Sequence, residues 1–281
     1  MAKRNRVSKG ADVDKRIKEG RGQGTGFDYK PWLLVQNVPS RGLVTRIKGW
    51  KTTRVHHLLS NLELNYFYVL EWSPKVCDIR EQYPLLPLSE TIAIAQQCGI
   101  RHPLDPKTQQ PVVMTTDFLI TMHQPIGVKD LARTIKLAKD LLSERTLEKL
   151  EIERRYWLKR DIDWGIVTEH EIPETLAKNV EWLHPFQKTT DLSPLTEPEI
   201  NRIATTLNLR ITIDSKALAD MTAECDDQLG LFPGTSLSVS RHLIANRQWQ
   251  VDMNKPIQPS QQLVLLATPI TEVSRILGGA E

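Results

Sequence analysis

The sequence predicts an α/β protein in which a mixed α/β domain is followed by a mainly α domain. Three observations favour this fold class: a length of 281 residues, alternating helix-like and strand-like segments up to residue 174, and a succession of helix-like segments after it. At roughly 100–200 residues per domain, such a chain is expected to form two domains. We expect a basic N-terminal arm at 1–57, the mixed domain at 58–174 and the helical domain at 175–281.

Apolar spacing and chain breakers predict the elements of the mixed domain. Apolar residues recur every four positions from Leu58 to Leu70, which predicts a helix that ends before Pro74. A strand is expected in the segment VCDIREQY that follows. Beyond it we predict a strand at 113–120, a hairpin connection at 121–130 and a second strand at 131–136. A helix capped by Ser143 is predicted at 143–160, and a third strand at 164–169. This order describes one mixed α/β unit.

The C-terminal domain is predicted to be mainly helical. Helices are expected at 197–208, 215–230 and 235–247, with a short strand, LRITI, between the first two. Two strand-like runs, WQVDM and QLVLLA, follow the last helix. Three helices that end in a hairpin have the outline of a winged helix.

The net charge of +3 conceals a strong asymmetry along the chain. Residues 1–57 hold 14 Lys and Arg against 4 Asp and Glu, a charge of +10, whereas residues 58–174 carry −4 and residues 175–281 carry −3. A concentration of positive charge indicates a polyanionic or phosphate-rich partner. The alternative is a basic tail that is simply solvated.

Several classes of protein are disfavoured by what the sequence lacks. The sequence contains no run of about 18 apolar residues, so no membrane span is predicted. The basic N-terminus has no apolar stretch behind it, so a signal peptide is not expected. The three cysteines form no CxxC pair, which fits reduced thiols and a cytoplasmic protein. No GxxxxGK[ST] or GxSxG motif is present.

Three polar residues stand in apolar surroundings: Glu63 in the first helix, Asp117 in the strand at 113–120 and Lys136 at the end of the next strand. Singly, each is more simply interpreted as a solvated side chain. Together they follow the order found in metal-dependent nucleases. Magnesium prefers oxygen ligands, so the two carboxylates and the carbonyl of Ile135 could hold Mg²⁺, or Mn²⁺ in its place. A lysine beside the metal can orient or deprotonate water and stabilise negative charge.

Several long segments resemble one protein family, the TnsA family of endonuclease subunits of heteromeric cut-and-paste transposases. They are RIKEGRGQG near the N-terminus, VHHLLSNLELNYFYVLEW at 55–72, DIREQYPLLP at 78–87, TTDFL at 115–119 and ERTLEKLEIERRYW at 144–157. Beyond about residue 190 only the order of elements is similar.

The resemblance implies a restriction-endonuclease-like N-terminal domain and a winged-helix-type C-terminal domain. It implies magnesium-dependent cleavage of the 5′ strands at transposon ends. The implied partners are transposon-end DNA, a separate transposase subunit of the integrase class and an ATP-dependent regulator.

Carried onto this chain, the family's catalytic residues fall on Glu63, Asp117 and a lysine. Lys129, Lys136 and Lys139 all lie in the window, and Lys136 is preferred because TIK ends a strand. One departure is Thr134, where nucleases of this fold usually have an acidic or amide residue. This leaves open an alternative: a catalytically weak DNA-binding and assembly subunit. A stand-alone restriction enzyme is a third alternative, which the resemblance disfavours.

Two other acids and a set of cations complete the expectations. Glu71 is expected to be structural. Glu153 is expected to face solvent, with support of the catalytic site from the helix that follows Lys136 as the alternative. The helical domain offers few cations on its last helix, so we expect it to dock proteins. The residues expected to contact DNA are Arg41, Arg46, Lys48, Lys51, Arg54, His56 and His57.

Overall fold

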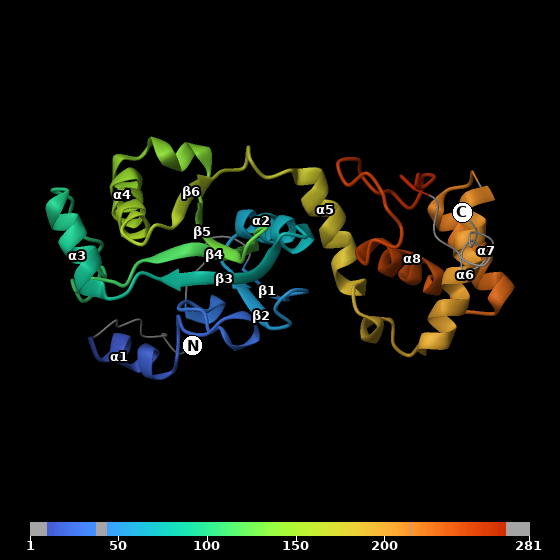
Figure 1. Cartoon of the computed structure of the whole chain (residues 1–281), viewed down its shortest axis with the longest axis horizontal. Helices are drawn as coiled ribbons and strands as arrows, with labels where there is room; N and C mark the ends of the chain where they lie inside the picture. Colours follow the sequence, from blue (N-terminus) through green and yellow to red (C-terminus); the bar gives the residue numbers. More distant parts are fainter. Residues whose placement is uncertain (1–9, 38–43, 214, 268–281) are drawn as a thin grey trace. The chain divides into compact units, whose positions relative to one another are not determined.

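The computed structural model describes residues 10–37, 44–213 and 215–267 (Figure 1). They form two compact units that divide between Ile172 and Pro173. Arg41 lies outside the described residues. Within the described ranges, no helix is long and apolar enough to cross a membrane.

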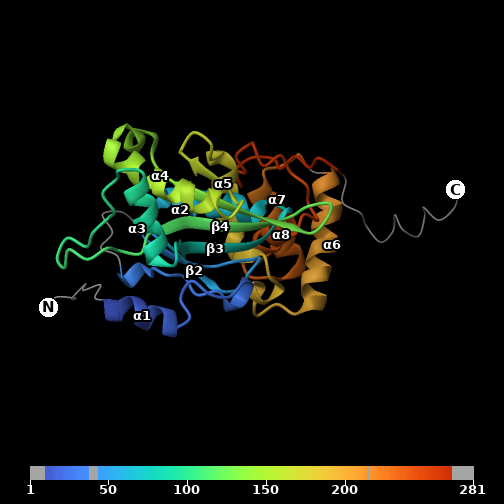
Figure 2. The same cartoon turned by 60° about the vertical axis from the view of Figure 1, so that its left-hand side comes forward.

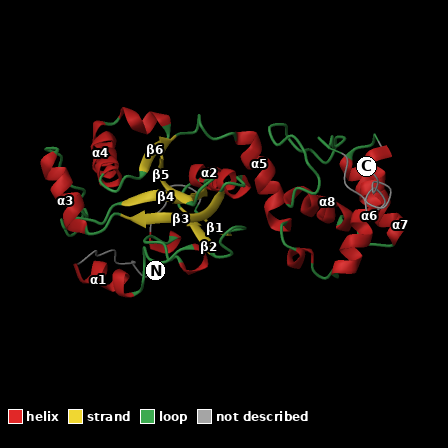
Figure 3. Cartoon of the chain, in the orientation of Figure 1, coloured by secondary structure: helices red, strands yellow, loops and turns green. Residues whose placement is uncertain are grey.

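The first unit contains two β-sheets and four α-helices among its described residues (Figure 3). Its helices are α1 (Gly10–Lys18), α2 (Asn61–Trp72), α3 (Leu88–Gln97) and α4 (Glu144–Leu158), with short 3-10 turns that include η1 (Gly26–Asp28), η2 (Val35–Asn37) and η3 (Ala138–Leu142). Its strands are β1 (Thr45–Lys48), β2 (Val55–Leu58), β3 (Val76–Pro84), β4 (Thr115–His123), β5 (Val128–Ile135) and β6 (Asp163–Val167).

The larger sheet has the order β3-β4-β5-β6. β4 is antiparallel to both β3 and β5, whereas β5 and β6 are parallel, with Ile135 opposite Val167. A parallel pair needs a long crossover, which η3 and α4 provide. β1 and β2 form a separate antiparallel pair.

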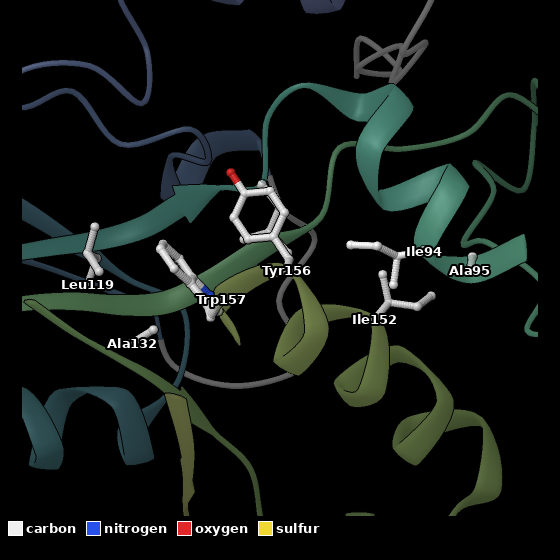
Figure 4. Close-up of a cluster of buried hydrophobic side chains, with 8 residues drawn as sticks. Ile94, Ala95, Leu119, Ala132, Ile152, Tyr156 and Trp157 are labelled. Carbon is white, nitrogen blue, oxygen red and sulfur yellow. The ribbon is translucent and has the colours of Figure 1, made fainter. Parts of the chain in front are cut away.

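The core of this unit lies between the sheet, α3 and α4. Figure 4 shows Tyr156 and Trp157 of α4 between Leu119 and Ala132 on the sheet and the α3 side chains. Trp157 is almost wholly buried and donates Nε1–H to Thr116 Oγ1 at 2.6 Å. Burial of large aromatic groups with their polar atoms satisfied stabilises such a core.

Most predicted elements of the first unit are confirmed, and two are corrected. The hairpin of β4 and β5, the helix capped by Ser143 and the strand β6 are as expected. The first helix begins at Asn61, because Ser60 accepts a hydrogen bond from Glu63 N and caps it, while Leu58 ends β2. The helix α3 was not predicted, because no element was expected between the strand in VCDIREQY and the strand at 113–120.

The glycine-punctuated segment at 20–26 packs against the end of β3. Gly22 has φ +75°, and a Cβ there would lie 2.2 Å from Pro84 Cγ, so only glycine fits against the end of β3. Trp32 N donates to Gln82 O at 3.2 Å. Figure 2 shows α1 and α4 on opposite sides of the larger sheet.

The second unit is helical within its described residues. Its helices are α5 (Glu174–Leu183), α6 (Glu197–Ile213), α7 (Leu218–Leu229) and α8 (Thr235–Ala245), with the short turns η4 (His184–Phe186) and η5 (Thr189–Leu192). The predicted strand LRITI is wrong, because this segment is the last turn of α6. Arg210 there donates to Glu224 and Gln228 of α7, at 3.0 and 2.7 Å, which holds the segment in the helix.

The predicted C-terminal hairpin is reduced to one bridge, between Val251 and Leu265. The helix before it, α8, packs against α5, α6 and α7 and is largely buried. Its Arg241 lies over the rings of Trp182 and Phe186 and donates to Trp182 O. Burial lowers the pKa of Arg241 to about 10. Arg241 is half-buried and His242 is buried, so neither side chain is open for phosphate contact.

Candidate active site

The structure brings Asp117 and Lys136 together across the β4–β5 hairpin. Asp117 lies in β4, directly across from Thr134, because Phe118 is the partner of Arg133. Lys136 follows β5, where its backbone N donates to Val167 O at 3.1 Å and continues the pairing with β6. The Lys136 ammonium lies 3.1 Å from Asp117 Oδ2. The sheet register therefore positions this ion pair.

Ile135 completes this arrangement through its backbone. Its N–H donates to Asp117 Oδ2 at 2.7 Å, and its carbonyl accepts from Lys136 Nζ at 2.8 Å. The ammonium thus bridges a carboxylate oxygen and a carbonyl oxygen. Although burial lowers the pKa of Lys136, the charges of Asp117 and Glu153 raise it above its usual value, so the ammonium keeps its proton.

Glu63 is buried in the first turn of α2 and faces the same charges. Its Oε2 accepts from Leu59 N at 2.9 Å, and its Oε1 accepts from Ser60 Oγ at 3.0 Å, so its side chain helps to close the N-terminal end of α2. Burial, followed by the negative charge of Asp117, raises the pKa of Glu63 to about 7. The charge of Lys136 lowers it in part. The three predicted catalytic residues therefore interact.

The other two lysines lie elsewhere. Lys129 is exposed near the far end of β5, opposite Met122, beside a surface hollow of about 480 Å³ that Lys75 and His123 also line. Lys139 is exposed in η3. The geometry around Asp117 therefore favours Lys136.

Glu153 of α4 lies near this ion pair. The expectation that it faces solvent is wrong, and its burial favours the alternative, a supporting role. Its side chain is 3% exposed. Its Oε1 accepts from Thr134 Oγ1, from Thr116 Oγ1 at 2.7 Å and from Trp164 Nε1 at 3.1 Å. Burial raises the pKa of Glu153 to about 6, against the lowering effect of the threonine hydrogen bonds. Thr134 is thus occupied as a donor to Glu153.

Substitutions of Glu153 are expected to separate its charge from its hydrogen bonds. Glu153→Gln keeps an acceptor oxygen for the three donors and removes the buried charge, so the free energy of unfolding should change by less than about 1 kcal/mol. Glu153→Ala leaves the donors unsatisfied and a cavity, and should cost about 2–5 kcal/mol. Urea unfolding at neutral pH measures both. Equal losses in the two variants would contradict this account.

Glu71 lies near the C-terminal end of α2 and is buried, in keeping with a structural role. It accepts from Trp50 N in the turn between β1 and β2. Burial raises the pKa of Glu71 to about 7, against the lowering effect of this hydrogen bond. Glu71 therefore holds the β1–β2 turn against the helix.

The residues expected to contact DNA separate into two groups. Arg46 and Lys48 are exposed on β1. Lys51 Nζ donates to Ser73 O at 2.7 Å. His57 Nδ1 accepts from Val35 N at 3.4 Å, and burial lowers the pKa of His57. Of these residues, Arg46 and Lys48 present their charge most openly to solvent.

Arg54 and His56 are instead buried, which argues against their expected contact with DNA. Arg54 Nη1 lies 2.8 Å from Glu81 Oε1, and His56 Nδ1 lies 2.8 Å from Glu81 Oε2. Glu81 is fully buried and also accepts from His57 N at 3.0 Å. Burial would raise the pKa of Glu81, but His56 and Arg54 hold it well below its usual range. Arg54 and His56 thus bind a buried carboxylate and join β2 to β3.

Comparison with known proteins assigns the two units to the two parts of one class of endonuclease. The family described as "TnsA-like endonuclease N terminal" matches residues 73–169, which include Asp117 and Lys136. The family described as "TnsA endonuclease C terminal" matches residues 171–253.

A curated relative makes the assignment specific. The Transposon Tn7 transposition protein TnsA of Escherichia coli is 44% identical over 246 residues, which cover 88% of this chain and 87% of the relative. The chain therefore belongs to the TnsA family of transposition endonucleases, and the resemblance found in the sequence is confirmed.

Proposed function

We propose that this protein is a magnesium-dependent endonuclease that cuts the 5′ strands at transposon ends. It would act with a separate transposase subunit of the integrase class and an ATP-dependent regulator, in the cytoplasm where bacterial DNA lies. The observation that carries the proposal is the Lys136 ammonium between Asp117 Oδ2 and the Ile135 carbonyl, beside the buried carboxylate of Glu63.

The donor set supports a divalent cation. The oxygens of Asp117 and Ile135 already share one cationic group. Burial and then the negative charge of Asp117 raise the pKa of Glu63, so a cation placed between these two carboxylates would stabilise their ionised forms. No cluster of three or more His, Cys, Asp or Glu suited to a metal occurs among the described residues. Two carboxylates and a carbonyl fit Mg²⁺, because this ion keeps several of its waters.

The residues of the chain would divide the chemistry as follows. When bound, magnesium would neutralise phosphate charge and lower the pKa of a water molecule. Glu63, Asp117 and the carbonyl of Ile135 would hold it. Lys136, whose ammonium lies between Asp117 Oδ2 and the Ile135 carbonyl, would orient water and stabilise charge on the phosphate.

Removal of the metal tests this proposal. We expect the full-length protein, together with its transposase partner and regulator, to cut the 5′ strands of transposon-end DNA in Mg²⁺ or Mn²⁺. A chelator should abolish those cuts, and added Mg²⁺ should restore them. Strand-resolved gel analysis of end-labelled DNA provides the measurement. Cleavage that is unchanged in the chelator would overturn the metal assignment.

A second function, that of a catalytically weak DNA-binding and assembly subunit, is favoured by one observation. Thr134 donates to Glu153 and is thereby drawn away from the metal position. This reading predicts the same complexes on DNA without cleavage of the 5′ strand, so the same gel analysis separates the two functions.

The finer features of the fold are also proposals. The order α2, β3, β4, β5, α4, β6, with its mixed sheet, supports a restriction-endonuclease-like first unit. The helices α6 to α8 and the bridge after them support a winged-helix-type second unit. Because α8 is buried and its Arg241 is engaged, we propose that this unit docks proteins rather than reads DNA.

We propose that Arg46 and Lys48 contact DNA phosphates. A double variant, Arg46→Ala with Lys48→Ala, should weaken binding of the full chain to DNA and reduce the slope of log affinity against log salt by about 1–2. Fluorescence anisotropy at several salt concentrations measures this slope. A control double variant, Lys178→Ala with Lys255→Ala, removes two exposed cations of the second unit. A slope that falls equally in the control would contradict the proposal.

A further inference from the structure

Gln82 of β3 lies beside the candidate active site, although nothing in its sequence context indicates a role there. Glu81 pairs with Phe118 and Tyr83 pairs with Thr116, so Gln82 stands directly across from Asp117. Its side chain is 2% exposed. A buried polar side chain beside a reactive carboxylate needs hydrogen-bond partners.

Two hydrogen bonds fix the orientation of the Gln82 amide. Its Nε2 donates to Glu63 Oε2 at 3.3 Å, and its Oε1 accepts from Thr115 Oγ1 at 3.3 Å. An ionised carboxylate can only accept, so the amide nitrogen has to face Glu63. The Gln82 amide thus links Thr115 of β4 to Glu63 of α2.

The backbone of Gln82 is unusual as well. Its φ is +50°, in the left-handed region that residues other than glycine rarely adopt. Such conformations persist where surrounding contacts impose them, and they cluster at functional sites. Here Trp32 N donates to Gln82 O, and Tyr29 Oη donates to Glu81 O at 3.0 Å. The packed N-terminal segment therefore holds this part of β3.

The consequence for Glu63 follows from its remaining capacity to accept hydrogen bonds. Ser60 Oγ occupies Oε1, while Leu59 N and Gln82 Nε2 both occupy Oε2. A carboxylate offers about four lone-pair positions. Three donors leave one lone-pair position open, on Oε1. Glu63 can therefore bind a cation through this single oxygen, whose direction the three hydrogen bonds fix.

We infer that Gln82 is a positioning residue that holds the carboxylate of Glu63 for metal binding. The inference rests on the proposed function, because it concerns the same metal site. Outer partners of this kind commonly change metal affinity by about 10–100-fold when they are removed. Gln82 would act through Glu63 and would not touch the substrate.

Binding of Mn²⁺ to the full-length protein, measured by calorimetric titration, tests the inference. Gln82→Met keeps the length of the side chain but removes its donor, and we expect it to weaken Mn²⁺ binding about tenfold. Thr115→Val keeps the amide but removes the partner that orients it, and should cause a smaller loss. A merely structural role would change thermal stability without changing Mn²⁺ affinity.

Gln109→Met is the matched control. Gln109 also has a positive φ, +55°, but it is exposed and its Nε2 donates to Pro106 O. The Mn²⁺ affinity of the Gln109→Met variant should equal that of the wild type. If Gln82→Met and Thr115→Val both bind Mn²⁺ as tightly as the wild type, the inference is overturned while the proposed function stands. If the wild type itself binds no Mn²⁺, the proposed metal site fails, and the inference falls with it. If Gln82→Met does not fold, Thr115→Val decides.

Discussion

Replacement of Asp117 by alanine is expected to reduce 5′-strand cleavage by the reconstituted complex at least about 10³-fold, while assembly on transposon-end DNA persists. Asp117 Oδ2 accepts from Lys136 Nζ and Ile135 N, so its loss removes the counter-charge of the lysine and one proposed metal ligand. Metal-dependent stabilisation of transition-state charge contributes several kcal/mol, and each 1.36 kcal/mol corresponds to a tenfold change in rate. Strand-resolved gels measure cleavage, and band-shift gels measure assembly.

Asp163→Ala is the control for this experiment. Asp163 begins the neighbouring strand β6 and pairs with Arg133, but its side chain is 49% exposed. An exposed ion pair contributes about 0–1 kcal/mol, so cleavage should remain within about twofold of the wild type. If Asp117→Ala still cuts the 5′ strands at the normal rate, Asp117 is not part of the active site.

Replacement of Glu81 by glutamine is expected to lower the free energy of unfolding by about 3–5 kcal/mol, because it leaves the buried guanidinium of Arg54 without its counter-charge. Arg54 is 7% exposed, and Glu81 is fully buried. Urea unfolding near pH 7 measures the loss. The control is Glu151→Gln in α4, which removes partly exposed pairs with Arg154 and Arg155 and should cost less than about 1 kcal/mol.

The dependence on pH gives a second test of the same contact. Because the pKa of Glu81 in the folded state is held well below its usual range, the native state releases this proton more readily than the unfolded chain. The contribution of Glu81 to stability is therefore present above the unfolded pKa of about 4.3 and is lost as the pH falls below it. Glu81→Gln should remove this part of the acid sensitivity. An unchanged acid profile would contradict the assignment.

Turn residues and apolar spacing, which act over a few positions, were enough to predict most helices and strands of the first unit. Pro125 and Gly127 marked the turn between two strands, and the hairpin set by that turn brings Asp117 near Lys136. The C-terminal strand prediction failed because LRITI is rich in β-branched residues, whereas contacts of Arg210 with α7 keep the segment helical.

The site predictions that were wrong concern residues whose contacts lie far away in the sequence. Arg54 and His56 resemble DNA-binding cations until Glu81, about 25 residues later, is placed beside them. Glu153 could have been recognised from its helical position. It lies three residues after Leu150 and four before Trp157, both buried, so it shares their apolar face.

The carboxylate of Glu63 has an evolutionary consequence. It completes the cap of α2 through Ser60 and Leu59, and it is also the proposed metal ligand. Selection for folding and selection for cleavage therefore act on one side chain. In a descendant that no longer cuts DNA, Asp117 would be free to drift, whereas Glu63 would still be retained by the stability of the helix.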